Sequence, residues 1–328
     1  MANLETTWMG IKLKNPLVVS SSGLTGNIDK IENIYKAGAG AIVLKSLFEE
    51  QILHESGKLI YNDHSNYPEA ADYLENYVKN NSVDKYLQLI ENAKKKVSIP
   101  VIASINCVSD SDWISFAKKI ETSGADGIEI NINIIPTEAD KNAEYYENEY
   151  FKIAEQLKSN INIPFSIKIG ANFTNLLYIV NQLKFRKVNS VTLFNKFYHP
   201  DINLNKMEFS AAGIFSSEND FPSTLRWIGI ISDKVEGIDI AASTGIHGAE
   251  NAIKALLAGA TVTQICSVLY QKGINHISNI LKDMNNWMSK NNFKDINSIK
   301  GKMNYGNVGN PKVYERSQFM KYYSSFEE

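Results

Sequence analysis

The sequence contains little cysteine and none of the spacings by which cysteines hold metal ions. Its 328 residues include two cysteines, Cys107 and Cys266, which show neither CxxC spacing nor a histidine-rich neighbourhood. Disulfide frameworks and zinc sites depend on such clusters, so neither has much support here. We expect two buried free thiols, no metal site and nothing to hold an iron–sulfur cluster.

Positive charge and long apolar runs are also scarce. Lysine and arginine number 34 against 36 aspartates and glutamates, a formal charge of −2 without the basic surplus typical of nucleic-acid-binding proteins. The opening segment MANLETTWMGIKLKNP has no apolar run of signal-peptide length, and no other stretch is long enough to span a bilayer. We therefore expect a soluble cytoplasmic protein that binds neither nucleic acid nor a membrane.

A repeated pattern of helix, small-residue stop and apolar strand organises the chain. It occurs as AGAGAIVLKS (37–46), ETSGADGIEINI (121–132) and LLAGATVTQICS (256–267), with KFRKVNSVTLFN (184–195) as a variant that lacks the glycine. Glycine ends helices well because it accepts a positive φ at the position after the last turn. These segments predict junctions between a helix and the strand that follows it.

Eight segments have the composition of strands and alternate with amphipathic helical segments. They are residues 17–23, 41–46, 100–106, 127–132, 165–170, 190–195, 238–244 and 262–267. Strands that alternate with helices imply right-handed parallel connections, and eight is the number that closes a (β/α)8 barrel. We predict an α/β (β/α)8 TIM barrel that spans residues 1–328 as a single domain after a short N-terminal hairpin. An open doubly wound sheet is the alternative.

Three long connections mark one end of the predicted barrel. They follow the second, fourth and sixth strands, at residues 47–99, 133–164 and 196–237. All three leave the C-terminal ends of strands, where the active sites of such barrels lie. We expect these loops to surround the site.

Polar side chains are frequent at the C-terminal ends of the predicted strands, among them serines, asparagines and two lysines. Lys45 ends the apolar run IVLKS, and Lys168 stands inside FSIKIG. A single polar residue at such a position is as easily a solvated strand end. A lysine in an apolar run is different, because a buried cation needs an anionic partner.

The seventh and eighth strands end in turns that suit an anion. Ser243, Thr244 and Gly245 precede a helix that starts near Ala249, and the last strand ends with Cys266 and Ser267 before another helix. Glycine lets backbone N–H groups approach an oxyanion, and a helix N-terminus adds a favourable dipole. Barrels often hold a phosphate between these two loops, although two ordinary capped turns are the alternative.

This set of residues fits a flavin better than a nicotinamide cofactor. The chain has no GxGxxG after an early strand with an acidic residue downstream, so a Rossmann dinucleotide site is absent. One phosphate site suits a mononucleotide, and a lysine at the pyrimidine edge of a flavin stabilises the charge that develops on reduction. The residues predict an FMN site. A barrel enzyme acting on a phosphorylated substrate, with Lys168 forming a Schiff base, is an alternative.

The same residues, in order, resemble the dihydroorotate dehydrogenase family, particularly its soluble class 1 type. The matching pieces are KNPLVVSSSG (14–23), VLKS (43–46), EIN (129–131), IKIGANFTN (167–175), FN (194–195) and STGIHGAENAIKALLAGATVTQICSVLYQKG (243–273). The last piece is the most specific because it has the order and spacing of the family's phosphate-binding region.

The resemblance implies FMN as cofactor and assigns residues to it. The implied FMN-binding residues are Ser21, Ser22, Lys45, Ser46, Asn131, Lys168, Asn195 and Gly213, with the phosphate on Thr244, Gly245, Cys266 and Ser267. Lys45 is implied to contact both flavin and substrate, and Lys168 the pyrimidine edge. The family further implies a homodimer and a soluble electron acceptor such as fumarate, with a separate partner subunit left open. The lack of an N-terminal amphipathic extension argues against the quinone-linked membrane type.

The substrate side departs from the family pattern. The family has a Cys or Ser after its fourth strand that takes a proton from the substrate, and Ile134 stands at that position here, followed by Ile135 and Pro136. Asn62, Asn195 and Lys196 are the implied substrate-binding residues, with Lys196 replacing a small hydroxyl residue.

Ile134 cannot act as a base, so another group must act if the reaction is retained. Thr137, Lys196, Tyr198 and His199 are the candidates. We therefore predict an FMN-dependent oxidoreductase, with dihydroorotate or a related small cyclic or carboxylated compound as donor. A flavin-binding relative with impaired catalysis is the alternative.

Overall fold

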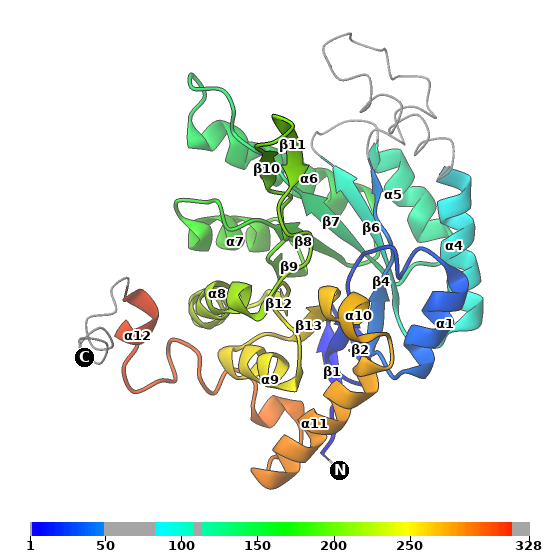
Figure 1. Cartoon of the computed structure of the whole chain (residues 1–328), viewed down its shortest axis with the longest axis vertical. Coiled ribbons are helices and arrows are strands. Elements are labelled where there is room, and N and C mark those ends of the chain that lie inside the picture. The colour runs from blue at the N-terminus through cyan, green and yellow to red at the C-terminus, as the bar shows by residue number, and fades with distance from the viewer. Residues whose placement is uncertain (1, 49–82, 108–112, 317–328) are drawn as a thin grey trace.

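The computed structural model describes residues 2–48, 83–107 and 113–316, and its centre is a closed barrel of eight parallel strands (Figure 1). The barrel strands are β3 (Leu17–Val19), β4 (Ala41–Val43), β6 (Val101–Cys107), β7 (Gly127–Ile132), β8 (Phe165–Ile169), β9 (Ser190–Leu193), β12 (Asp239–Ala242) and β13 (Val262–Ile265). Each pairs in parallel with both neighbours, and the pairs β13–β3 and β4–β6 close the ring. The predicted (β/α)8 barrel is confirmed.

Six of the eight barrel strands, all except β6 and β7, end earlier at their carboxyl ends than the sequence pattern predicts. The first strand ends at Val19, and Ser22 begins a turn in which its carbonyl accepts hydrogen bonds from the backbone and the hydroxyl of Thr25. Seryl side chains compete for backbone groups in this way. The strand ends therefore project polar side chains into the barrel mouth.

Helices surround the barrel and follow the strands in alternation (Figure 1). They are α1 (Ile28–Lys36), α4 (Val83–Lys96), α5 (Trp113–Thr122), α6 (Ala143–Asn160), α7 (Leu176–Phe185), α8 (Phe221–Lys234), α9 (Ala249–Ala258), α10 (Ser267–Lys272) and α11 (His276–Lys290), with α12 (Lys312–Glu315) near the C-terminus. Asn27, Asn142 and Asn175 cap three of them by accepting backbone N–H bonds. Such caps stabilise a helix by about 1 kcal/mol each.

The predicted junctions between helix and strand have the expected backbone conformation. Gly38, Gly124 and Gly259 have φ values of 104°, 87° and 115°. The variant junction without glycine places Lys187 in the same region, at φ 64°. A lysine is strained there in a way that glycine is not, because its Cβ approaches the backbone. The repeated pattern in the sequence is thus a repeated backbone geometry.

The N-terminal hairpin closes the bottom of the barrel. It is formed by β1 (Thr6–Trp8) and β2 (Ile11–Leu13), which pair antiparallel as predicted. Trp8 is fully buried and donates through its indole nitrogen to Ser190 Oγ at 2.8 Å, while Asp239 accepts from the Met9 backbone N–H at 2.8 Å. Buried aromatic side chains of this size contribute about 3–5 kcal/mol. The hairpin leaves the opposite end of the barrel for the site.

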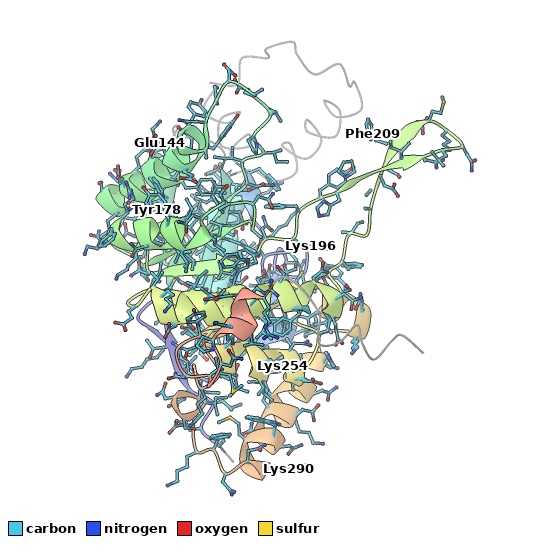
Figure 2. The ribbon with its side chains drawn as sticks, turned by 90° about the vertical axis from the view of Figure 1, so that its left-hand side faces the viewer. Glu144, Tyr178, Lys196, Phe209, Lys254 and Lys290 are labelled. Atoms are coloured by element: carbon cyan, nitrogen blue, oxygen red, sulfur yellow. The ribbon has the colours of Figure 1, made fainter. Side chains whose placement is uncertain are left out.

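The long connections lie at that opposite end. Residues 133–142 follow β7 and lead into α6, and β5 (Leu47–Phe48) extends the sheet beside β6. After β9 the chain forms an antiparallel hairpin, β10 (Pro200–Asn203) and β11 (Glu208–Ala211), which stands away from the barrel (Figure 2). Short 3₁₀ turns occur at Glu218–Asp220 and Ile296–Ser298. Within the described ranges, no helix has both the length and the apolar composition that crossing a bilayer requires.

Candidate functional site

A cavity of about 440 Å³ opens at the carboxyl ends of β3, β8, β9, β12 and β13. The structure brings together in its wall nine of the predicted site residues: Ser21, Ser22, Lys168, Asn195, Lys196, Thr244, Gly245, Cys266 and Ser267. They come from five different strands, and parallel strands of a barrel end at one rim. This convergence makes the cavity the candidate functional site.

One end of the cavity is a turn whose backbone geometry suits an anion. Thr244 and Gly245 are consecutive residues with φ values of 74° and 82°, and the Thr244 hydroxyl donates to the Phe194 carbonyl at 2.8 Å. Turns of this kind present backbone N–H groups to an anion. Helix α9 begins four residues after Gly245, at Ala249. Its N-terminus adds a favourable dipole to this end of the cavity.

Cys266 and Ser267 complete the same end from the other loop. The Ser267 hydroxyl accepts from the backbone N–H of Ser216 at 3.0 Å and from its hydroxyl at 3.1 Å. Burial raises the pKa of the Cys266 thiol, against the opposing effects of a hydrogen bond with Ser22 and the charge of Lys168. A neutral thiol adds no negative charge to this end, so it does not repel an anionic ligand.

Lys168 projects from β8 into the middle of the site with its charge almost shielded from water. The residue is 6% exposed, and its Nζ donates to Ser20 Oγ at 3.1 Å. The anionic partner that its burial calls for is Glu129 on β7, whose Oε1 lies 4.0 Å from Nζ. Lys168 is therefore a buried cation with one hydrogen bond to a hydroxyl and a carboxylate nearby.

Asn131 and Ser46 adjoin the cavity through Ser21. The hydroxyls of Ser21 and Ser46 lie 2.9 Å apart, and Asn131 Nδ2 donates to Ser46 Oγ at 3.0 Å. Ser46 also contacts Ser104 Oγ at 2.8 Å. The side-chain oxygen of Asn131 is buried and has no hydrogen-bond partner among the described residues. An unpartnered acceptor beside a cavity suits a ligand that brings an N–H donor.

The remaining predicted residues lie around the rim. Lys45 packs its aliphatic chain against Gly26, where an added Cβ would lie 3.0 Å from Lys45 Cδ. Gly213 is exposed on the returning arm of the hairpin, next to Ile214, which lines the cavity. Asn62 lies outside the described residues.

Ile134 faces a different space from the other predicted residues. It lines a second cavity of about 300 Å³, together with aromatic side chains that include Tyr146, Tyr150 and Phe173. Its backbone N–H donates to the Tyr150 hydroxyl at 3.5 Å. The next residue, Ile135, is 66% exposed. The segment after β7 thus turns from the main cavity toward an aromatic hollow.

Of the four residues considered as replacement bases, Lys196 alone lines the described part of the main cavity. Thr137, Tyr198 and His199 are exposed. The ammonium of Lys196 is paired with Asp220 at 3.0 Å. Burial by itself would raise the pKa of Asp220, but hydrogen bonds from Ser217 and Lys196 outweigh it and hold that pKa below its usual value. Lys196 therefore enters the cavity wall as the partner of a carboxylate.

Neither Gln264 nor Glu129 was assigned to the site from the sequence. Gln264 lines the cavity from β13 and is 2% exposed, and Glu129 lies fully buried on β7. The available signal was a polar residue inside an apolar strand, VTQI in one case and GIEI in the other. The described residues contain no group of three His, Cys, Asp or Glu side chains able to hold a metal ion.

Comparison with known proteins places the chain among redox enzymes. A profile of the family described as dihydroorotate dehydrogenase matches residues 3–288, which include the whole cavity wall. Three similar proteins are each named dihydroorotate dehydrogenase B (NAD(+)), catalytic subunit. The Thermoplasma acidophilum protein is 27% identical over 92% of this chain and 99% of its own length. The Thermoplasma volcanium protein is 24% identical over 92% and 98%, and the Methanocaldococcus jannaschii protein 24% identical over 88% and 94%.

Proposed function

The chain belongs to the dihydroorotate dehydrogenase family, and from that premise we propose that it is an FMN-dependent oxidoreductase of a small cyclic or carboxylated compound. The observation that carries the proposal is one cavity whose wall holds a turn suited to an anion and a buried lysine, with the unpartnered amide oxygen of Asn131 linked to that wall through Ser46 and Ser21. The turn suits a phosphate, and the other two suit the polar edge of a ring. A flavin mononucleotide has both parts in one molecule.

The residues present fit FMN without rearrangement of the cavity wall. Thr244, Gly245 and Ser267 would hold the phosphate, and Asn131 would offer its buried oxygen to a ring N–H. Lys168 would lie at the pyrimidine edge, with Asn195, Lys45 and the backbone near Ser21 and Ser22 around the ring. When bound, FMN supplies a two-electron acceptor at N5 of its ring. The protein supplies binding, orientation and charge.

The substrate side argues for a donor other than dihydroorotate, or for slow oxidation of dihydroorotate itself. Ile134 has no proton-accepting atom, and Lys196 is committed to Asp220. Lys196 lies beside Asn195 in the cavity wall, where its ammonium group can donate a hydrogen bond to a carboxylated substrate as well as to Asp220. A lost general base typically costs about 10²- to 10⁴-fold in rate. We therefore expect turnover of dihydroorotate far below that of enzymes that have the base.

The test is anaerobic reduction of the purified, FMN-loaded protein by dihydroorotate, followed by the loss of flavin absorbance. The Ile134→Cys variant puts a thiol in the wall of the second cavity, and bleaching up to about 10²-fold faster than wild type would show that a proton acceptor at this position reaches the substrate. Ile135→Cys is the matched control, since its side chain is 66% exposed and points away from both cavities. A wild-type protein that is colourless and takes up no added FMN would overturn the proposal.

One observation favours a second function, a flavin-binding protein that has lost catalysis. Among the described residues that line the main cavity, Lys196 was the one candidate base, and it is held in an ion pair. In that case neither wild type nor Ile134→Cys would be bleached by dihydroorotate, while dithionite would reduce both. Screening other carboxylated cyclic donors against the wild type separates a changed substrate from lost activity.

We also propose that the protein works as a cytoplasmic homodimer with a soluble electron acceptor or an electron-accepting subunit. The relatives are named catalytic subunits, which implies a partner. The β10–β11 hairpin supports an assembly because Ile202, Leu204, Met207 and Phe209 are all more than half exposed on it. Sedimentation of wild type against the Leu204→Ser, Met207→Ser double variant tests this. A wild type that sediments as a monomer at all concentrations would contradict the homodimer.

A further inference from the structure

Glu129 is a fully buried carboxylate directly beneath the candidate site. It lies on β7 with 0% exposure, paired in the sheet with Ser104 on one side and Ser166 on the other. Its Oε2 accepts a hydrogen bond from Thr192 at 2.8 Å and one from Gln264 Nε2 at 2.5 Å. Burying a carboxylate is costly unless it is bonded and paired with opposite charge. Burying Glu129 therefore costs free energy that other contacts must offset.

The opposite charge comes from Lys168. Within the described part of the chain, Lys168 is the one cation within 4.0 Å of Glu129, and that distance joins Nζ to Oε1. Oε1 has no hydrogen-bond partner among the described residues. Lys168 is instead bonded to Ser20, whose hydroxyl donates to Gln264 at 3.0 Å, and Gln264 in turn donates to Glu129. A closed ring of contacts thus links the lysine to the carboxylate.

This ring places the lysine between two anionic groups once a reduced flavin is bound. Lys168 lines the cavity. Glu129 does not line it, and its carboxylate lies 4.0 Å from the lysine Nζ. The positive charge that Lys168 can offer to the cavity is therefore partly balanced in advance. A charge shared with one anion stabilises a second anion less than an unshared charge does.

We infer that Glu129 is a positioning residue that holds Lys168 by charge and limits how strongly the lysine stabilises the reduced cofactor. This inference rests on the proposed function, because it takes the cavity to hold FMN. Its consequence is a lower reduction potential, so that the reduced flavin passes its electrons on more readily. A purely structural role for Glu129 would support the barrel interior without affecting the cofactor's potential.

The experiment measures the midpoint potential of bound FMN, and the dissociation constants of its oxidised and reduced forms, in wild type and Glu129→Gln. The substitution keeps the size of the side chain and removes its charge. Binding of reduced relative to oxidised FMN should become roughly tenfold stronger, a positive shift of about 30 mV for a two-electron couple. Equal potentials in the two proteins would overturn the inference.

Thr192→Val is the matched control. It removes one hydrogen bond to Glu129 Oε2 and the contact with Ser166, but it leaves every charge in place. A structural role predicts that both variants lose stability and neither changes the potential. The proposed role predicts that Thr192→Val changes stability alone, whereas Glu129→Gln also moves the potential.

A second measurement tests the pair without any cofactor. Urea unfolding of apoprotein carrying Glu129→Gln, Lys168→Met or both forms a double-mutant cycle. Lys168→Met should lower the unfolding midpoint much more in the wild-type background than in the Glu129→Gln background, because only the former leaves a buried carboxylate unpaired. Additive effects would overturn the pairing. If Glu129→Gln alone does not fold, Glu129→Asp takes its place: it moves the carboxylate away from Lys168 Nζ, so the potential should again shift in the positive direction, and an unchanged potential would overturn the inference.

The outcomes separate this inference from the proposed function. A wild type that binds no FMN overturns the proposed function and this inference together. A wild type that binds FMN with the same potential as Glu129→Gln overturns this inference alone.

Discussion

At the ends of β3, β8, β12 and β13, polar side chains are buried and bonded to one another, whereas after β7 and β9 the chain turns outward. Ser20, Ser243 and Gln264 are at most 5% exposed on the first side. On the second, Ile135 and Tyr198 are each 66% exposed, and the hairpin carries Phe209 well away from Lys196 (Figure 2). At the ends of β3, β8, β12 and β13, which we call the cofactor half, hydrogen bonds hold the polar side chains in place. The segments after β7 and β9, which we call the open half and expect to meet the substrate, are exposed.

The comparison separates two properties that the proposed function requires. Holding a cofactor needs many residues from several strands in one arrangement, so each constrains the others through hydrogen bonds such as those of Ser20, Gln264 and Lys168. Taking a proton from a substrate needs one residue at one position, which the family resemblance assigns to Ile134. A single loop can change without loss of the cofactor site. On a barrel of this kind, a loop that contributes to function can change while the fold stays the same.

If the cofactor half is the more tightly packed of the two, the largest loss of stability and of FMN binding should come from Gly245→Ala. An added Cβ would lie 2.5 Å from the backbone nitrogen of Phe221, and φ is 82°. Backbone strain and overpacking together should lower the free energy of unfolding by about 2–4 kcal/mol and abolish FMN retention. Urea unfolding and flavin content after gel filtration measure both.

Gly248→Ala is the control for that substitution. Gly248 has an extended backbone with φ −162°, and no heavy atom of the described residues lies within 4 Å of its built Cβ. Its replacement should change stability by about 1 kcal/mol or less. If Gly245→Ala behaved like Gly248→Ala, the cofactor half would be more tolerant than its packing indicates.

Lys168→Met should have the next largest effect on FMN binding, in addition to the loss of stability expected from the unpaired Glu129 carboxylate. A hydrogen bond to a charged group contributes about 1.5–3 kcal/mol, so the dissociation constant for FMN should rise by roughly 10- to 100-fold. Lys254→Met is the control, because Lys254 is an exposed lysine of α9 paired with Glu250 (Figure 2). Fluorescence titration with FMN compares the two. Equal affinities would remove Lys168 from the site.

Local signals explain how much of this could be predicted from the sequence. Gly38, Gly124 and Gly259 predicted the junctions between helix and strand, because a positive φ depends on one residue and its immediate neighbours. The convergence of Ser21, Lys168 and Thr244 on one cavity could be predicted because strand ends converge in any barrel of this kind. The fold and most of the cavity wall follow from such signals.

Contacts that depend on register between distant strands could not be predicted. Glu129 meets Gln264 only because β7 and β13 face each other across the closed barrel, 135 positions apart. The sequence marked Ile134 as a departure, but its position against Tyr146 and Tyr150 depends on the path of residues 133–142. A loop path is set by packing against other elements, and no short-range pattern encodes it.

Lys196→Met, where the cofactor half meets the open half, should lower the free energy of unfolding by less than the substitutions above. It breaks the ion pair with Asp220, in which both side chains are about 30% exposed, so we expect a loss of about 0.5–1 kcal/mol at neutral pH. The pKa of Asp220 is lowered in the folded protein, so its contribution is present above the unfolded-state pKa and is lost as the pH falls through the folded one. The difference from wild type should therefore shrink toward zero in acid. Urea unfolding at neutral and acidic pH would show it, and a difference that persisted in acid would assign the loss to packing instead.

The smallest effect should come from Ile135→Ser, in the open half. Its side chain is 66% exposed and lies in the wall of neither cavity, so removing it exposes little new surface. Surface substitutions of this kind usually change the free energy of unfolding by less than about 0.5 kcal/mol. FMN affinity should match wild type, measured by the same fluorescence titration as for Lys168→Met. A marked loss of FMN on changing Ile135 would show that the loop after β7 still helps to hold the cofactor, and the two halves of the mouth would then form a single binding site.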